Sequence, residues 1–281
     1  MSSVLVIKDL CKEYPKFRLD HVSFEVEAGT IMGFIGRNGA GKTTTLKALM
    51  NLIHPSGGTI RYFGQSLEEQ EKEIKQRVGY ASGGVHYYER KKIKEIVNIT
   101  KLFYDNWDDE AYHHYLELFA LDEDKRLREL SEGMKVKFNL ALALSHHADF
   151  LILDEPTSGL DPVSREELLE VFLDIASSGV AILFSTHITS DLDKCADYIT
   201  YIRKGQIIAS KKTDEFIGQY RLITQEDNMT EQQKKSFLGV CKNRSGSTAL
   251  ILEKDSALFL PEQVKTVDLE TIMVHLEKEE A

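Results

Sequence analysis

A run of small and polar residues at positions 36–44 has the composition and spacing needed to bind phosphate. It reads GRNGAGKTT and fits the pattern G-x-x-x-x-G-K-[ST]. Glycines let the backbone wrap round an anion so that successive N–H groups point inward, while Lys42 reaches the β- and γ-phosphates and the Thr43 hydroxyl ligates Mg²⁺. We therefore expect a nucleoside triphosphate to bind here. The residues of this predicted loop are Gly36, Arg37, Asn38, Gly39, Ala40, Gly41, Lys42, Thr43 and Thr44.

The elements that must position this loop are predicted on both sides of it. Residues 30–35 form an apolar run that is typical of a buried strand, and residues 44–50 have the pattern of a helix. The positive N-terminal end of that helix adds to the attraction for phosphate. A strand, a glycine-rich turn and a helix in this order are the context that the motif requires.

Two carboxylates follow a second apolar run. Residues 150–155 read FLILDE, as expected for a parallel strand that is buried on both faces. Ligand chemistry in such sheets lies at the carboxyl ends of the strands. We therefore expect Asp154 to hold Mg²⁺, directly or through water, and Glu155 to lie nearest an attacking nucleophile.

A second anion site is predicted before that strand. Residues 130–134 read LSEGM and open an apolar-periodic helix that extends to about His146. Ser131 is a good N-cap residue, and its hydroxyl together with the free N–H groups of the first turn can bind an anion. Two phosphate sites in one chain are best explained if the second one serves the nucleotide of a partner chain.

These motifs together resemble the nucleotide-binding subunit of ATP-binding cassette (ABC) transporters, over about residues 4–220, and most of all the ATPases of bacterial ABC-2 type exporters. Residues 155–161, EPTSGLD, resemble the end of the family's Walker B strand and its D-loop. His187, in the sequence FSTH, resembles the switch histidine. Tyr14 lies where the family stacks an aromatic ring on adenine.

The resemblance implies an ATPase that works as a head-to-tail dimer, either of two copies or with a related subunit. Each ATP lies between the phosphate loop of one chain and Ser131, Gly133 and Asp161 of the other. Glu155 polarises the attacking water, and His187 contacts the γ-phosphate. It further implies a separate membrane-spanning permease subunit, export of an unidentified substrate, and a cytoplasmic position on the inner face of the cell membrane.

The chain departs from the family pattern at two places. The usual signature LSGGQ has Glu132 and Met134 at its third and fifth positions, whereas Ser131 and Gly133 are kept. Where the family usually has a glutamine, after residues 78–80, this chain has Gly83, which offers no side chain to a metal or to water. Either a neighbour such as Ser82 or a solvent molecule substitutes for it, or the coupling to the membrane partner is unusual.

Two alternative functions remain open on the sequence. One is a soluble ABC ATPase that acts on ribosomes, DNA ends or cluster assembly, although this chain has neither a second cassette nor a long coiled-coil insertion. The other is a nucleotide-gated assembly subunit with little turnover, which Gly83 and the altered signature favour. The intact set of Lys42, Asp154, Glu155 and His187 favours catalysis.

Composition agrees with an ATPase of the cell interior. The net charge of −10 over 281 residues argues against binding of nucleic acid, for which a basic patch is needed. The three cysteines (Cys11, Cys195 and Cys241) are scattered, as expected for a reducing compartment. No apolar run approaches the roughly 20 residues of a membrane span, and no signal segment is recognisable.

The predicted fold is α/β, with a P-loop NTPase core in which a mixed or parallel sheet is flanked by helices. An antiparallel β region precedes the core, and a helical signature subdomain spans about residues 86–147 within an ATPase domain of residues 1–218. Residues 219–281 are predicted to form a small α+β appendix with strands at 220–223, 248–252 and 257–260 and a closing helix at 268–276. Its role is either packing against the main domain or dimerisation and regulation.

Overall fold

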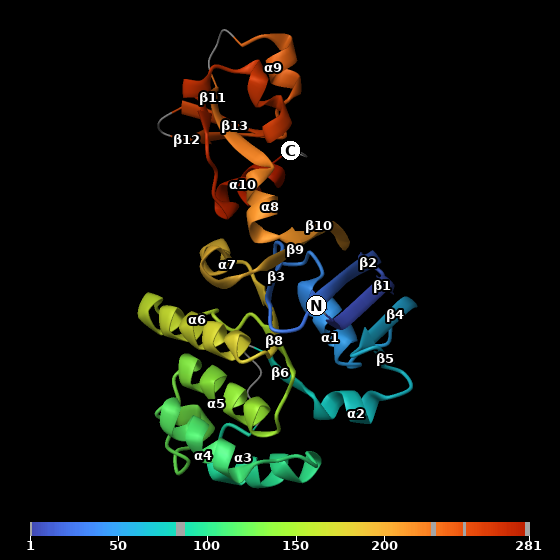
Figure 1. Ribbon diagram of the computed structural model, residues 1–281, viewed down its shortest axis with the longest axis vertical. Coiled ribbons are helices and arrows are strands. Elements are labelled where there is room, and N and C mark those ends of the chain that lie inside the picture. Colours follow the sequence, from blue (N-terminus) through green and yellow to red (C-terminus); the bar gives the residue numbers. More distant parts are fainter. Residues whose placement is uncertain (1, 83–87, 226–228, 244–245, 279–281) are drawn as a thin grey trace. The chain divides into compact units, whose positions relative to one another are not determined.

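The computed structural model describes residues 2–82, 88–225, 229–243 and 246–278. The chain divides into two compact units (Figure 1). The first comprises Met1–His187 and Cys195–Ser210, and the second comprises Ile188–Lys194 and Lys211–Ala281. The first unit contains every residue that the sequence places at the nucleotide.

A six-stranded sheet forms the centre of the first unit, in the strand order β10-β9-β3-β8-β7-β6. Strands β9, β3, β8, β7 and β6 run parallel to one another. Every residue of β3, β7 and β8 is buried, which explains why these strands read as continuous apolar runs. The strands are β3 (Ile31–Ile35), β6 (Val78–Ser82), β7 (Phe150–Asp154), β8 (Ala181–Thr186), β9 (Tyr198–Arg203) and β10 (Gln206–Lys212).

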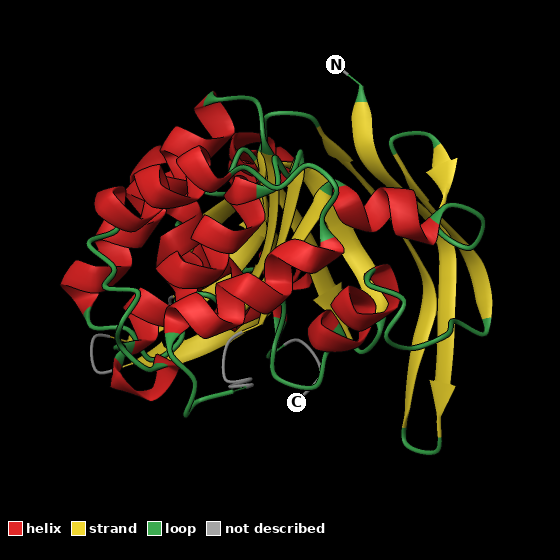
Figure 2. Ribbon diagram, turned by 90° about the horizontal axis from the view of Figure 1, so that it is seen from below, coloured by secondary structure: helices red, strands yellow, loops and turns green. Residues whose placement is uncertain are grey.

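A second, antiparallel sheet has the order β2-β1-β4-β5. A single hydrophobic core joins this sheet to helix α1 (Lys42–Leu49) and to the central strands, and the Tyr62 hydroxyl within it donates to the Leu49 carbonyl at 2.9 Å. Figure 2 shows the long antiparallel strands beside the central ones. The strands of this sheet are β1 (Ser3–Tyr14), β2 (Phe17–Glu27), β4 (Gly57–Tyr62) and β5 (Gln65–Ser66).

Helices cover the central sheet and form the predicted helical region. Helix α5 packs on β6, and α6 packs on β3 and β8. Helices α3, α4 and α5 lie together in Figure 1. The structure thus confirms the predicted fold class. These helices are α2 (Glu71–Gln76), α3 (Ile93–Thr100), η1 (Lys101–Phe103), α4 (Asp109–Leu118), η2 (Leu127–Glu129), α5 (Glu132–Ser145) and α6 (Pro162–Ser177).

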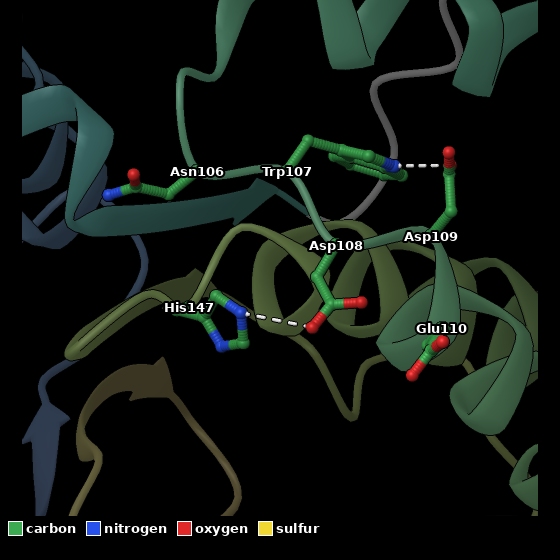
Figure 3. Close-up of a pocket in the computed structure, with 6 residues that line it drawn as sticks. All are labelled: Asn106, Trp107, Asp108, Asp109, Glu110 and His147. Atoms are coloured by element: carbon green, nitrogen blue, oxygen red, sulfur yellow. Dashed lines mark hydrogen bonds and ion pairs between the residues drawn. The ribbon is translucent and has the colours of Figure 1, made fainter.

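A surface depression of about 580 Å³ lies at the start of α4 (Figure 3). Two of its acidic side chains, those of Asp108 and Asp109, have structural partners. Asp108 accepts a hydrogen bond from the Ala111 backbone N–H at 2.9 Å and lies 3.3 Å from His147 Nε2, and the Trp107 indole N–H donates to Asp109 at 2.8 Å. The depression is therefore the capped beginning of a helix.

The second unit contains a four-stranded antiparallel sheet in the order β12-β13-β11-β14. Its small core consists of Ile223, Met229, Ile251 and Phe259. The buried His275 on α10 bonds to Thr248 through Nε2 and to the Thr271 carbonyl through Nδ1. The elements are α7 (Thr189–Cys195), α8 (Thr213–Gly218), β11 (Tyr220–Gln225), α9 (Glu231–Lys235), β12 (Gly239–Asn243), β13 (Gly246–Leu252), η3 (Glu253–Leu258), η4 (Pro261–Gln263), β14 (Val264–Lys265) and α10 (Leu269–Leu276).

The predicted strand at 257–260 is not formed in the structure. Ala257 and Leu258 are the last residues of the 3₁₀ helix η3, and Phe259, which follows it, packs in the small core. Helix α2 begins only at Glu71, because the Leu67 N–H still bonds to the Ile60 carbonyl of β4 at 3.1 Å. In both places a contact distant in sequence overrides the local pattern.

Within the described ranges, no helix has the length and apolar character needed to cross a membrane.

We predict that acid weakens the helical region through His146. Burial lowers the pKa of this histidine below its usual value of 6.5; its ring stacks on Tyr104 at 3.7 Å, and its Nδ1 lies 3.0 Å from the Gln76 carbonyl oxygen. Because the folded pKa is the lower one, its stabilising contribution is complete above about pH 6.5 and declines as the pH falls through the folded pKa. Trp107, the only tryptophan, reports unfolding of this region by fluorescence. The urea midpoint should fall less between pH 7.5 and 5.5 in His146→Phe than in the unsubstituted chain. Substitution of the exposed His147 should leave that fall of the midpoint as large as in the unsubstituted chain.

Candidate functional site

Three adjacent parallel strands end at one edge of the central sheet and bring the predicted site residues together. The phosphate-binding loop follows β3, Asp154 ends β7, and His187 follows β8. The parallel register pairs Asp154 with Ser185 and Ile35 with Thr186. Residues far apart in sequence therefore lie side by side where α/β sheets bind ligands.

The loop turns tightly into α1. Gly41 is the N-cap of this helix and has φ 119°, and Gly39 has φ 83°, so both occupy backbone conformations that suit glycine. The Thr45 hydroxyl donates to the Gly41 carbonyl at 3.0 Å. Lys42, at the first position of the helix, is only 5% exposed.

The Asp154 carboxylate is held by two hydroxyl groups. Its Oδ1 accepts hydrogen bonds from Thr43 Oγ1 at 3.3 Å and from Ser185 Oγ at 2.6 Å. Thr43 is the loop residue predicted to share Mg²⁺ with Asp154, so the structure brings the two expected ligands into contact.

Both oxygens of the Glu155 carboxylate are engaged. Oε1 lies 3.2 Å from Lys42 Nζ, and Oε2 lies 2.7 Å from His187 Nδ1. Lys42 Nζ also donates to the Gly36 carbonyl at 2.7 Å. Glu155 itself has φ 52°, a left-handed conformation that costs a non-glycine residue about 1–3 kcal/mol. Such strain is typical of functional sites, where the surrounding contacts enforce it.

A pocket of about 620 Å³ lies over this arrangement. The cationic side chains of Lys16, Arg37 and Lys42 line it together with a single carboxylate, that of Glu155. Positive charge at a helix N-terminus favours an anion of high charge density such as a triphosphate. The described lining residues are Lys16, Phe17, Arg37, Asn38, Gly39, Gly41, Lys42, Thr43, Thr44, Glu155, Ser158 and His187.

The chemistry of the donors fits Mg²⁺. The Thr43 hydroxyl and the Asp154 carboxylate are hard oxygen ligands that already lie within hydrogen-bond distance of each other. Mg²⁺ usually takes one or two protein ligands and fills its shell with phosphate and water, so a larger cage is unnecessary. No group of three or more His, Cys, Asp or Glu side chains suited to a metal occurs in the described part of the chain.

Comparison with known proteins gives a consistent answer. A family model described as "ABC transporter" matches residues 19–158. The bacitracin transport ATP-binding protein BcrA of Bacillus licheniformis is 34% identical over 242 residues, which cover 85% of this chain and 79% of that protein. The ABC transporter ATP-binding protein YtrB of Bacillus subtilis is 30% identical over 72% of this chain and 69% of that protein. A solved ATP-binding subunit of an ABC transporter superimposes with a TM-score of 0.68 at 28% identity, over 75% of this chain and 91% of that one.

This chain belongs to the ABC transporter family. It is an ATP-binding subunit, as the motifs predicted.

The aromatic residue predicted to stack on adenine is not among the residues that line the pocket. Tyr14 ends β1, is 44% exposed and lies 5.6 Å below the Lys12 ammonium group. Phe17, its partner across the hairpin turn, is the aromatic residue that lines the pocket. The sequence did not single out Phe17, because only the hairpin pairing brings it beside Tyr14. Stacking of Tyr14 on adenine stays a prediction.

The two signature residues lie at the start of α5 and not among the residues that line this pocket. Ser131 is exposed and caps the helix by accepting a hydrogen bond from the Met134 N–H at 3.2 Å. Gly133 is buried, and a Cβ added there would meet Leu160 Cδ2 at 3.5 Å.

Asp161 is the N-cap of α6 and also lies outside the pocket lining. Its carboxylate accepts hydrogen bonds from the backbone N–H groups of Val163 and Ser164 and from the Ser164 hydroxyl at 2.6 Å. The bond from the Ser164 hydroxyl lowers the pKa of Asp161, so the group is an anion. Gly83, where the family usually has a glutamine, lies outside the described residues.

We predict that space, rather than backbone conformation alone, makes Gly41 irreplaceable. A Cβ at Gly41 would meet Leu19 Cδ2 at 2.7 Å and Phe17 Cζ at 3.0 Å, whereas one at Gly39 would meet nothing within 4 Å. Both positions have positive φ, 83° at Gly39 and 119° at Gly41, so Gly39→Ala controls for the effect of a side chain at a positive φ. Gly41→Ala should weaken binding of a fluorescent ATP analogue by more than tenfold and lower the melting temperature more than Gly39→Ala does. Equal losses in the two variants would contradict the steric explanation.

Proposed function

We propose that this chain is the ATP-hydrolysing subunit of an ABC exporter and powers a separate membrane-spanning permease. The observation that carries the proposal is the Glu155 carboxylate, which follows the buried strand β7 and contacts both Lys42 of the phosphate loop and His187. The strained backbone of Glu155 holds its carboxylate where it could activate a water molecule. The names of relatives that transport bacitracin or export Nod factor support an export function for this chain.

The first step is an exchange of partners at Lys42. The buried ammonium group needs an anion, and in this structure Glu155 supplies it at 3.2 Å. When a triphosphate enters the pocket, Lys42 pairs with its β- and γ-phosphates instead of with Glu155. Glu155 Oε1 then becomes available to accept a hydrogen bond from water. The nucleotide thus activates the base by removing its counter-ion.

His187 keeps Glu155 oriented during this exchange. Its Nδ1 lies 2.7 Å from Glu155 Oε2, so one carboxylate oxygen stays fixed while the other is released. The opposite ring nitrogen is then suited to contact the γ-phosphate. Bound Mg²⁺ would be held by Thr43 and Asp154, and it supplies charge neutralisation on the phosphates.

Completion of the site requires a second chain. Ser131, Gly133 and Asp161 are proposed to contact the nucleotide of a partner, because they lie outside the pocket lined by their own chain. The exposed N-terminus of α5 offers backbone N–H groups to the phosphates. We therefore propose a head-to-tail homodimer, or a heterodimer with a related ATPase, on the inner face of the cell membrane. ATP binding closes the dimer, and hydrolysis opens it to move the permease.

The first test replaces the proposed base. Glu155→Gln keeps the shape of the side chain but cannot accept the proton of water, so phosphate release should fall by about 10²–10⁴-fold. ATP binding should persist, and the variant should accumulate as an ATP-bound dimer in size-exclusion chromatography with light scattering.

Glu170→Gln makes the same chemical change at an exposed position of α6 and serves as the control. Turnover near that of the unsubstituted chain in Glu155→Gln would remove Glu155 from the base role. A negligible rate in the unsubstituted chain, with and without a permease, would favour a nucleotide-gated assembly subunit instead.

The second test addresses the partner's site. Ser131→Arg places a bulky side chain where the triphosphate of the other chain is proposed to lie. The monomer should bind a fluorescent ATP analogue normally but should fail to dimerise. Ser131→Ala removes the helix cap without adding bulk, at a cost of about 1 kcal/mol, and separates the effect of the cap from that of the collision. Loss of nucleotide binding by the Ser131→Arg monomer would place Ser131 in its own chain's site.

A further inference from the structure

Ser185 connects two residues of the proposed site through one buried hydroxyl group. It lies near the end of β8, directly opposite Asp154 in the parallel register, and is 0% exposed. Its Oγ donates to Asp154 Oδ1 at 2.6 Å and accepts from the Glu155 backbone N–H at 3.0 Å. A serine hydroxyl has one proton to donate, and here that proton goes to Asp154.

The bond to Asp154 limits how the carboxylate can turn. Oδ1 accepts hydrogen bonds from the hydroxyl groups of Ser185 and Thr43, whereas no described residue hydrogen-bonds to Oδ2. A short hydrogen bond to an ionised acceptor is stronger than one between neutral groups, so the Ser185 contact is the tighter of the two. Thr43 is also a proposed Mg²⁺ ligand, whereas Ser185 is not. Of the two partners of Asp154, Ser185 is therefore the one that need not bind the metal itself.

The bond to Glu155 fixes the point where the chain leaves the strand. The Glu155 N–H is shared between the Ser185 carbonyl oxygen at 3.1 Å and the Ser185 hydroxyl at 3.0 Å. This N–H belongs to the residue with φ 52°, whose side chain lies between Lys42 and His187. Ser185 therefore holds the strained backbone from which the proposed base projects.

We propose that Ser185 is a positioning residue for this site: it sets the orientation of the Asp154 carboxylate toward the divalent cation and the direction of Glu155. The inference rests on the proposed function, and it assigns Ser185 no contact with the nucleotide. Partners of this kind, which hydrogen-bond a metal-ligating carboxylate, typically contribute 10–100-fold to metal affinity or activity.

A purely structural role predicts a different pattern of effects. The sheet has another fully buried strand hydroxyl, that of Thr200 on β9, which bonds to Ser210 Oγ at 2.8 Å. Thr200→Val removes that hydroxyl without changing the size of the side chain much, and Thr200 is not among the residues of the proposed site. It is therefore the matched control for losing a buried hydroxyl from this sheet.

The experiment compares Ser185→Ala and Ser185→Thr with Thr200→Val in the full chain. Manganese is titrated, by electron paramagnetic resonance, into protein saturated with a non-hydrolysable ATP analogue. Binding of the analogue alone is measured in EDTA. Ser185→Ala should weaken Mn²⁺ binding by about tenfold and leave metal-free nucleotide binding unchanged. Its ATPase activity should fall, and the Mg²⁺ concentration for half-maximal activity should rise. Ser185→Thr, which keeps the hydroxyl and suits a strand, should restore the metal affinity.

The proposal would be overturned if Ser185→Ala and Thr200→Val bound Mn²⁺ with equal affinity. It would also be overturned if Ser185→Ala lost metal-free nucleotide binding by the same factor as Mn²⁺ binding. If Ser185→Thr does not fold, the comparison of Ser185→Ala with Thr200→Val still decides the question. Absence of ATP hydrolysis by the unsubstituted chain would contradict the proposed function instead, and the Mn²⁺ titration would still test Ser185 on its own.

Discussion

The contact between Lys42 and Glu155 is the interaction on which the proposed chemistry depends. Lys42 is almost fully buried, and a buried ammonium group is costly unless an anion lies beside it. In this structure the anion is the carboxylate proposed as the base. In the proposed mechanism, Lys42 stays paired with Glu155 until the phosphates of a nucleotide replace that carboxylate. The proposed exchange would link nucleotide binding to activation of Glu155 as the base.

The central sheet makes this contact possible. Lys42 begins the helix after β3, Glu155 follows β7, and His187 follows β8, so three strands must end at one level for the three side chains to meet. The parallel pairing of β3 with β8 and of β8 with β7 sets that level. Ser185 then joins the strand ends laterally, through its bonds to Asp154 and Glu155. The three strands β3, β7 and β8 are fully buried and closely packed, and a stiff scaffold suits groups that must hold their positions against strain.

The second unit has a core and a hydrogen-bonded sheet of its own. Its four antiparallel strands enclose a small apolar cluster, and the buried His275 bonds to Thr248 and Thr271 of that unit. The predicted appendix begins at residue 219, and the second unit begins at Lys211 and also includes Ile188–Lys194. A dimerisation or regulatory role for this unit stays a prediction, as does the alternative of simple packing.

The sequence by itself identified the family, and it predicted the phosphate loop, the paired carboxylates Asp154 and Glu155, and His187 as site residues. These are encoded by residue type at fixed local spacing, and by short apolar runs that are typical of buried parallel strands. The tertiary structure decided the rest, because it depends on contacts between residues far apart in the chain. It showed Glu155 between Lys42 and His187, placed Phe17 rather than Tyr14 in the pocket lining, and formed no strand at 257–260, where the 3₁₀ helix η3 ends. Ser185 is the clearest case: nothing in its local sequence marks a role, and only the register of β8 against β7 places its hydroxyl on Asp154.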